Sequence, residues 1–185
     1  MFEGNLLRLF LVLWLSCIGL FANLAHANLV NGEEVRQLEW EELMPEDYSL
    51  DALFDSQMSS LETLNDYDTE AMALMDEMML VLSSAPIVPE MDQKMVRLPG
   101  FVVPVLGDDR VITSFFLVPY FGACIHAPPP PSNQIVYVEF EPGIKIENLY
   151  DAVWVTGKLS TETTTNELAS SGYKMEAFII EPYEE

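Results

Sequence analysis

The stretch SFFLVPYFGACIHAPPPPSNQIVYVEF, residues 114–140, carries two strand patterns joined by a proline-rich loop. The first pattern is a strongly apolar run that ends at Tyr120. The second follows the loop, where Val136 and Val138 alternate with their neighbours as in a strand with one buried face. Strand patterns punctuated by glycine and proline are typical of small β domains, and we expect both to belong to one.

Strand patterns separated by glycine and proline also occur on both sides of this stretch. Apolar or alternating runs separated by Pro-Gly and Gly-Asp signals predict five strands within residues 94–105, 110–120, 133–140, 150–161 and 173–183. Five short strands predict a small antiparallel β-barrel, and their pattern resembles that of OB-like barrels. We expect this OB-like β domain to span residues 90–185. Its predicted core contains Val103, Phe116, Val118, Val136, Val138, Val153, Val155 and Ile179.

Residues 28–89 predict an acidic helical segment in front of the barrel, giving an α+β fold. Apolar residues recur at helical spacing within 33–44, within 49–64 and within 68–82. The last of these predicted helices carries three methionines on one face, Met72, Met75 and Met79. Methionine thioethers bind copper(I), but methionines interleaved with leucines at this spacing favour a packing role in the core.

The first 27 residues have the layout of a secretory signal peptide. Arg8 precedes an apolar run that continues to Phe21, and the Ala-His-Ala triplet at 25–27 forms an A-x-A cleavage site. We therefore expect cleavage before Asn28, a periplasmic mature protein and no retained membrane span. A retained anchor is the competing interpretation.

The charge of the chain excludes one class of partner. The sequence has 30 acidic and 8 basic residues, and its net charge is −22. Phosphate backbones require clustered lysine and arginine, so we expect no nucleic acid to bind. A cationic protein surface or a metal cation remains compatible with this charge. The plainer interpretation is an acidic, well-solvated surface.

Loss of residues 1–27 would leave one cysteine and one histidine, Cys124 and His126, two positions apart. In an extended segment, residues at i and i+2 point to the same side of the backbone. A single cysteine forms no disulfide within its own chain. The pair is therefore the most concentrated chemistry in the mature sequence.

Three interpretations of this pair remain open. Thiolate and imidazole are favoured zinc ligands, and they also suit copper, with carboxylates, water or a second chain completing the site. Alternatively, His126 activates Cys124 as a nucleophile, although the sequence identifies no oxyanion donors and no orienting group. In the third interpretation, Cys124 is a small buried residue and His126 a hydrogen-bonded loop residue.

The proline run next to the pair suggests a surface for a partner. Pro128, Pro129, Pro130 and Pro131 predict a stiff polyproline rod of about 12 Å. Such a rod can hold a loop rigidly or enter an aromatic groove of another protein. The amides of Asn133 and Gln134 can tie the loop back to the fold. We count these six residues as candidate partner-binding residues.

Three motifs carry a resemblance to a known family. The stretches RLPGFVVPV, FFLVPYFGACIHAPPPPSNQIVYV and VWVTGKL resemble exported bacterial proteins that share a domain of unknown function, over about residues 90–182. Genes of this family often lie beside FtsX-like ABC permease components and zinc-linked exported proteins. The resemblance therefore implies zinc and a membrane partner, and it supplies no catalytic residues.

Together, these patterns predict an exported, non-enzymatic protein. It would bind or deliver a transition metal, most simply zinc, beside an ABC-type permease or another exported metal-binding protein. The alternative is a metal-free adaptor that docks to the same complex through its proline loop. A cysteine-dependent enzyme is the third hypothesis.

Overall fold

The computed structural model of the chain describes residues 29–49, 68–107, 111–123, 129–145 and 152–183. The backbone divides into two compact units, Met1–Glu34 and Val35–Glu185. In the first unit, β1 (Leu29–Val30) and β2 (Glu33–Glu34) pair antiparallel as a short hairpin. Within the described ranges, no helix is long and apolar enough to cross a membrane.

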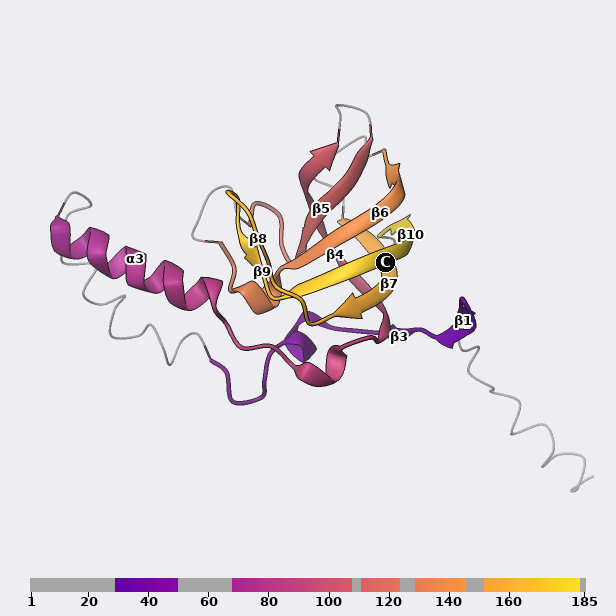
Figure 1. Ribbon diagram of the computed structural model, residues 1–185, viewed down its shortest axis with the longest axis horizontal. Coiled ribbons are helices and arrows are strands. Elements are labelled where there is room, and N and C mark those ends of the chain that lie inside the picture. Colours follow the sequence, from indigo (N-terminus) through magenta and orange to yellow (C-terminus); the bar gives the residue numbers. More distant parts are fainter. Residues whose placement is uncertain (1–28, 50–67, 108–110, 124–128, 146–151, 184–185) are drawn as a thin grey trace, which may run out of the picture. The chain divides into compact units, whose positions relative to one another are not determined.

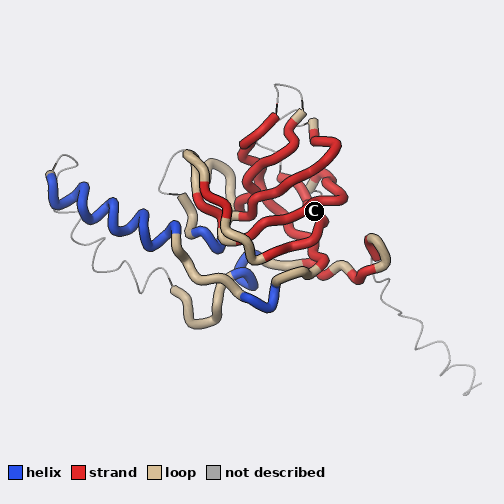
Figure 2. The backbone as a smooth tube through the Cα atoms, in the orientation of Figure 1, coloured by secondary structure: helices blue, strands red, loops and turns tan. Residues whose placement is uncertain are grey.

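The second unit is built around a five-stranded β-barrel (Figures 1 and 2). Its strands are β4 (Met95–Gly107), β5 (Ile112–Val118), β6 (Val136–Ile144), β7 (Ala152–Ser160) and β10 (Tyr173–Pro182). Hydrogen-bonded neighbours follow the order β4–β5–β6–β10–β7, and β7 pairs again with β4, so the sheet closes on itself. The predicted small barrel is therefore confirmed.

The barrel is mixed, whereas the strand pattern of the sequence predicts an antiparallel one. β6 and β10 run parallel, with Tyr173 opposite Val136 and Glu176 opposite Glu139. The two strands are neighbours in space but not in sequence, because β7 and a small hairpin, β8 (Thr164–Thr165) with β9 (Ser170–Ser171), lie between them. The chain therefore returns to β6 in the same direction.

The long strand β4 turns a corner of the barrel. It continues through Pro99 and Gly100, both of which lie within the strand predicted at 94–105. Its residues up to Phe101 pair with β7, and those from Phe101 onward pair with β5. A Cβ atom on Gly100 would lie 2.8 Å from both the Leu117 side chain and the Val118 carbonyl oxygen. Glycine thus permits the close approach that the corner needs.

Strand β5 is buried on both faces. Phe115 and Leu117 belong to the main core cluster, while Phe116 and Val118 belong to a second, smaller cluster. Most of the predicted core is confirmed: the buried members are Phe116, Val118, Val136, Val138, Val153 and Val155. Val103 is half-buried and packs against the second cluster.

Ile179 does not belong to the core, contrary to our prediction. The alternation of β10 places Tyr173, Met175 and Ala177 inward, which would also turn Ile179 inward. However, the register between β10 and β7 shifts between Ala177 and Ile179. This bulge exchanges the faces of the following residues, so Ile179 is exposed and Ile180 packs against the main core.

The segment 35–44 is part of the barrel core and is not an α-helix. β3 (Arg36–Gln37) pairs parallel with β4, and a short 3₁₀ helix, η1 (Trp40–Leu43), follows. Leu38, Trp40 and Leu43 are buried in the main cluster. The helix predicted for 33–44 is therefore wrong, because strand pairing and the burial of Trp40 override the local helical spacing.

The one α-helix among the described residues is α3 (Thr69–Ser83), which confirms the helix predicted there. The helix predicted within 49–64 lies almost wholly outside the described residues. The buried face of α3 carries Ala71, Met78 and Leu82. Met72, Met75 and Met79 lie outside this face and are exposed, so their predicted core role is wrong. Two further 3₁₀ helices are η2 (Pro89–Met91) and η3 (Ser132–Gln134).

Candidate functional site

The loop between β5 and β6 holds every residue that the sequence marked as a candidate site. Cys124, His126 and Pro128 lie outside the described residues. The structure describes the two arms that flank them, 119–123 before the pair and 129–135 after it. The geometry of these arms determines where the chain leaves the barrel and where it returns.

The first arm ends in a turn that is fixed to the barrel. The backbone N–H of Ala123 donates to the Tyr120 carbonyl at 3.4 Å, and Gly122 adopts a φ of +82°. Ala123 is 1% exposed and belongs to the second core cluster. Next to it, the exposed ring of Phe121 meets Phe101 edge-on, with 6.1 Å between ring centroids. The residue immediately before Cys124 is therefore held in place.

The second arm begins with prolines that are mostly inside the protein. Pro130 and Pro131 are buried, whereas Pro129 is half-buried. Pro131 has φ −59° and ψ 149°, which is polyproline II geometry and agrees with the predicted rod. Of the three prolines of this run that the structure describes, only Pro129 keeps an appreciable surface for a partner.

Asn133 and Gln134 tie the second arm to the fold, as their amides predicted. Asn133 is fully buried, and its Nδ2 donates to the Pro86 carbonyl at 2.8 Å. Gln134 is nearly buried, and its Nε2 donates to the Trp40 carbonyl at 2.8 Å. The Asn133 Oδ1 atom has no hydrogen-bond partner among the residues that the structure describes. Both side chains therefore act inside the protein, away from the surface that a partner would touch.

Two aromatic residues that the sequence analysis did not single out complete this anchoring. The Trp40 Nε1–H donates to the Pro99 carbonyl at 2.7 Å, so Trp40 joins β4 to the second arm through Gln134. The Tyr173 hydroxyl accepts from the Val88 N–H at 2.7 Å and donates to the Leu43 carbonyl at 2.9 Å. Burial raises the pKa of Tyr173 above its usual value. In the sequence, the spacing of Leu38 and Trp40, two positions apart, is the signal that could have indicated an extended segment with one buried face.

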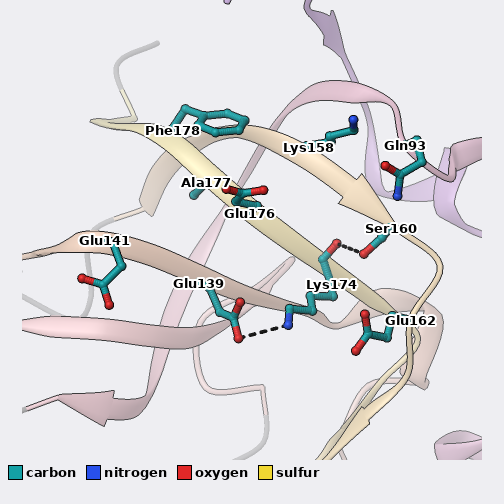
Figure 3. Close-up of a pocket in the computed structure, with 10 residues that line it drawn as sticks. All are labelled: Gln93, Glu139, Glu141, Lys158, Ser160, Glu162, Lys174, Glu176, Ala177 and Phe178. Carbon is teal, nitrogen blue, oxygen red and sulfur yellow. Dashed lines mark hydrogen bonds and ion pairs between the residues drawn. The ribbon is translucent and has the colours of Figure 1, made fainter. Parts of the chain in front are cut away.

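A second candidate is a hollow on the outer surface of β6, β7 and β10 (Figure 3). Its lining combines the lysines Lys158 and Lys174 with an excess of carboxylates. These are Glu139, Glu141, Glu162 and Glu176. The hollow is thus a charged surface on the strands around the parallel pair.

The charges in this hollow are paired weakly. Lys174 Nζ lies 3.1 Å from Glu139 Oε1, and this hydrogen bond raises the pKa of Lys174. Both side chains are partly exposed, so solvent screens the ion pair. Across the described residues, no group of three or more histidine, cysteine or acidic side chains is arranged to hold a metal ion. The described residues of the hollow therefore form no three-ligand metal centre.

Comparison with known proteins connects the barrel and its loop to one family. The family described as "Protein of unknown function (DUF3299)" matches residues 40–182, a range that begins at Trp40. A crystal structure of a DUF3299 family protein from Pseudomonas aeruginosa PAO1 is similar, with a TM-score of 0.61 and 34% sequence identity. The similarity covers 82% of this chain and 98% of that chain. No curated protein matches the chain significantly.

Proposed function

The chain belongs to the DUF3299 family, and we propose that it is an exported, non-enzymatic metal-binding protein. The metal would bind at the loop between β5 and β6, with Cys124 and His126 as ligands. Zinc is the first candidate because thiolate and imidazole are its preferred protein ligands, and copper is the second. Asp, Glu, water or a second chain would complete the coordination.

The anchoring of both arms of the loop carries this proposal. The chain leaves the barrel at buried Ala123 and returns at buried Pro130, and the amides of Asn133 and Gln134 fix the return. Ligand sites on rigid supports lose less conformational freedom on binding than sites on loose chain.

We further propose that the barrel is OB-like. Numbered along the chain, its strands follow the order first, second, third, fifth, fourth, and the fourth pairs back with the first. This order and the parallel pairing of the third and fifth strands support a five-stranded Greek-key barrel. Barrels of this kind present loops for ligands, so the fold is compatible with a binding function but does not specify one.

Export and a membrane partner are further parts of the proposal. The charged start, the apolar run and the A-x-A triplet at 25–27 support cleavage before Asn28 and a periplasmic location. In that compartment, the protein would deliver its metal beside an ABC-type permease or another exported metal-binding protein. Intact mass measured on the exported protein tests the first step. A chain that still contains residues 1–27 would contradict it.

A metal-free adaptor is the second candidate. Pro129 supports it, because this residue remains half-exposed and lines a surface groove beside α3. The burial of Pro130, Pro131, Asn133 and Gln134 counts against an adaptor that docks through the whole proline run.

Native mass spectrometry of the chain from Asn28 with added zinc tests the metal proposal. We expect one zinc ion on the wild-type protein, and its loss in Cys124→Ser and in His126→Ala. Binding should weaken as the pH falls below about 6.5, because protonated histidine is not a ligand. Glu176→Gln is the matched control, since it removes an acidic residue on β10, in the hollow of Figure 3, and should leave uptake unchanged. Equal uptake by all four proteins, or none by any, would favour the adaptor.

A further inference from the structure

A groove of about 380 Å³ lies between the carboxyl-terminal half of α3 and the β8–β9 hairpin. Asp76, Met79, Leu80 and Ser83 line it from the helix, and Leu168 lines it from the hairpin. Pro129 also reaches it from the loop described above. This groove is distinct from the hollow in Figure 3, which is lined by β6, β7 and β10.

Large apolar side chains are exposed along this helix and at the groove. Five of them are between 37% and 68% exposed: Met72, Met75, Met79, Leu80 and Leu168. The helix already buries a face of its own, formed by Ala71, Met78 and Leu82. Among the described residues, these side chains give the same helix a second, uncovered apolar surface, and clustered exposed apolar residues mark interaction sites.

The charge around the groove is negative, and no described residue in the groove lining neutralises it. Asp76 and Glu167 line the groove, and Glu70 and Glu77 lie on the same helix. No lysine or arginine occurs between Arg36 and Lys94 in the sequence, and the groove lining contains none. The three ion pairs found among the described residues use none of these four acids. A ligand that complements this surface must therefore be both apolar and cationic.

We propose that this groove and the methionine face of α3 bind a basic amphipathic helix of a partner protein. An amphipathic helix presents apolar residues at i, i+3, i+4 and i+7, and these can lie in a groove beside a second helix. Methionine suits such a surface because its unbranched, polarizable side chain repacks around different neighbours. The acids on α3 and at residue 167 would pair with lysine or arginine on the polar face of the partner helix.

A peptide pair separates this recognition from general attraction to an acidic protein. One peptide contains leucine and lysine at helical spacing over about 18 residues, or five turns. The other has the same composition in an order without helical periodicity. Fluorescence anisotropy with the purified chain from Asn28 should show tighter binding of the amphipathic peptide, by about tenfold. Higher salt should weaken this binding, because part of it is electrostatic.

Variants locate the binding surface. Met75→Gln/Met79→Gln/Leu80→Gln should remove the preference for the amphipathic peptide, whereas Leu106→Gln should keep it. Leu106 is the matched control because it is 61% exposed on β4 and is absent from the groove lining. Asp76→Lys should weaken binding and reduce its salt dependence. Circular dichroism establishes that each variant keeps the fold of the wild-type protein.

Several outcomes would overturn the proposal. Equal binding of the two peptides would mean that net charge alone attracts them, and unchanged binding by the triple variant would exclude the groove. If the wild-type protein forms a dimer and the triple variant is monomeric, the groove binds a second copy of this chain and not a partner protein. Cys124→Ser should bind the peptide like the wild-type protein, so this test fails or succeeds independently of the proposed metal site.

Discussion

Strand β5 and helix α3 are both rich in large apolar residues, and they differ in what covers them. From Phe115 to Val118, every residue of β5 is fully buried, because one core cluster lies on each side of the strand. Helix α3 buries one narrow face and exposes Met72, Met75 and Met79. Apolar spacing therefore identifies the element in both regions, but the neighbours supplied by the rest of the chain decide whether its side chains are covered.

Phe115→Ala tests the covered side of this comparison and should have the largest effect. Its ring is fully buried in the main cluster, so truncation leaves a cavity and should lower the free energy of unfolding by about 3–5 kcal/mol. Urea denaturation of the chain from Asn28 measures the change. A loss below about 1 kcal/mol would mean that β5 is less tightly enclosed than its burial indicates.

Tyr173→Phe should have the next largest effect, because it removes hydroxyl contacts without changing the packed ring. The Val88 N–H and the Leu43 carbonyl would both lose their partner, which should cost about 1–3 kcal/mol. Equal stability of variant and wild type would show that water replaces the hydroxyl at both groups.

The same substitution has a signature in alkaline solution. The usual pKa of tyrosine, which applies to the unfolded chain, is 10.0, and burial raises the pKa of Tyr173 above it in the folded chain. Between the unfolded-state pKa and the higher folded-state pKa, the folded state therefore binds more protons than the unfolded state. The stability of the wild-type protein should therefore be independent of this group below pH 10.0 and should fall as the pH rises above it. In Tyr173→Phe this decrease should be smaller. Denaturation midpoints measured from pH 8 upward provide the comparison.

Gln134→Ala examines the anchored arm of the loop and should cost about 1 kcal/mol, because the Trp40 carbonyl loses a buried donor. Gln37→Ala is the matched control, since this glutamine is exposed on β3 and should change stability by less than about 0.5 kcal/mol. If the two variants behave alike, the amide of Gln134 does not secure the loop.

Met75→Gln tests the uncovered side and should have the smallest effect, within about 0.5 kcal/mol of the wild-type protein. The contrast is Met78→Gln on the same helix, which places a polar amide on the buried face and should cost about 1–3 kcal/mol. Thermal melting followed by the helical circular dichroism signal measures both. A larger loss for Met75→Gln than for Met78→Gln would reverse our assignment of the two faces.

The barrel strands could be predicted from the sequence because each strand pattern is complete within a few consecutive residues. Alternation at Val136 and Val138, or at Val153 and Val155, depends only on local spacing, and these residues are buried as predicted. Ile179 could not be predicted in the same way. Its face depends on a bulge that arises from the pairing of β10 with β7.

In the N-terminal segment and in the loop, too, the contacts depend on residues far away in the sequence and could not be predicted from local patterns. Nothing within residues 33–44 indicates that Trp40 would meet Pro99 and Gln134, since those partners lie far along the chain. The amides of Asn133 and Gln134 were predicted to tie the loop, but their acceptors, the Pro86 and Trp40 carbonyls, depend on the tertiary structure. Local patterns thus predict which residues can form contacts, and the tertiary structure determines which residues are their partners.

The hydrogen bond from the Tyr173 hydroxyl to the Leu43 carbonyl has a consequence for how the chain is made. It joins residues 130 positions apart, and the parallel pairing of β6 with β10 also waits for the last strand. The early segment around Trp40 therefore has no complete set of partners until synthesis is almost finished. Chains whose contacts are this distant in sequence fold over about milliseconds to seconds, more slowly than helical bundles. We therefore expect a nascent chain of this protein to close its barrel only after β10, the last strand, has been synthesised.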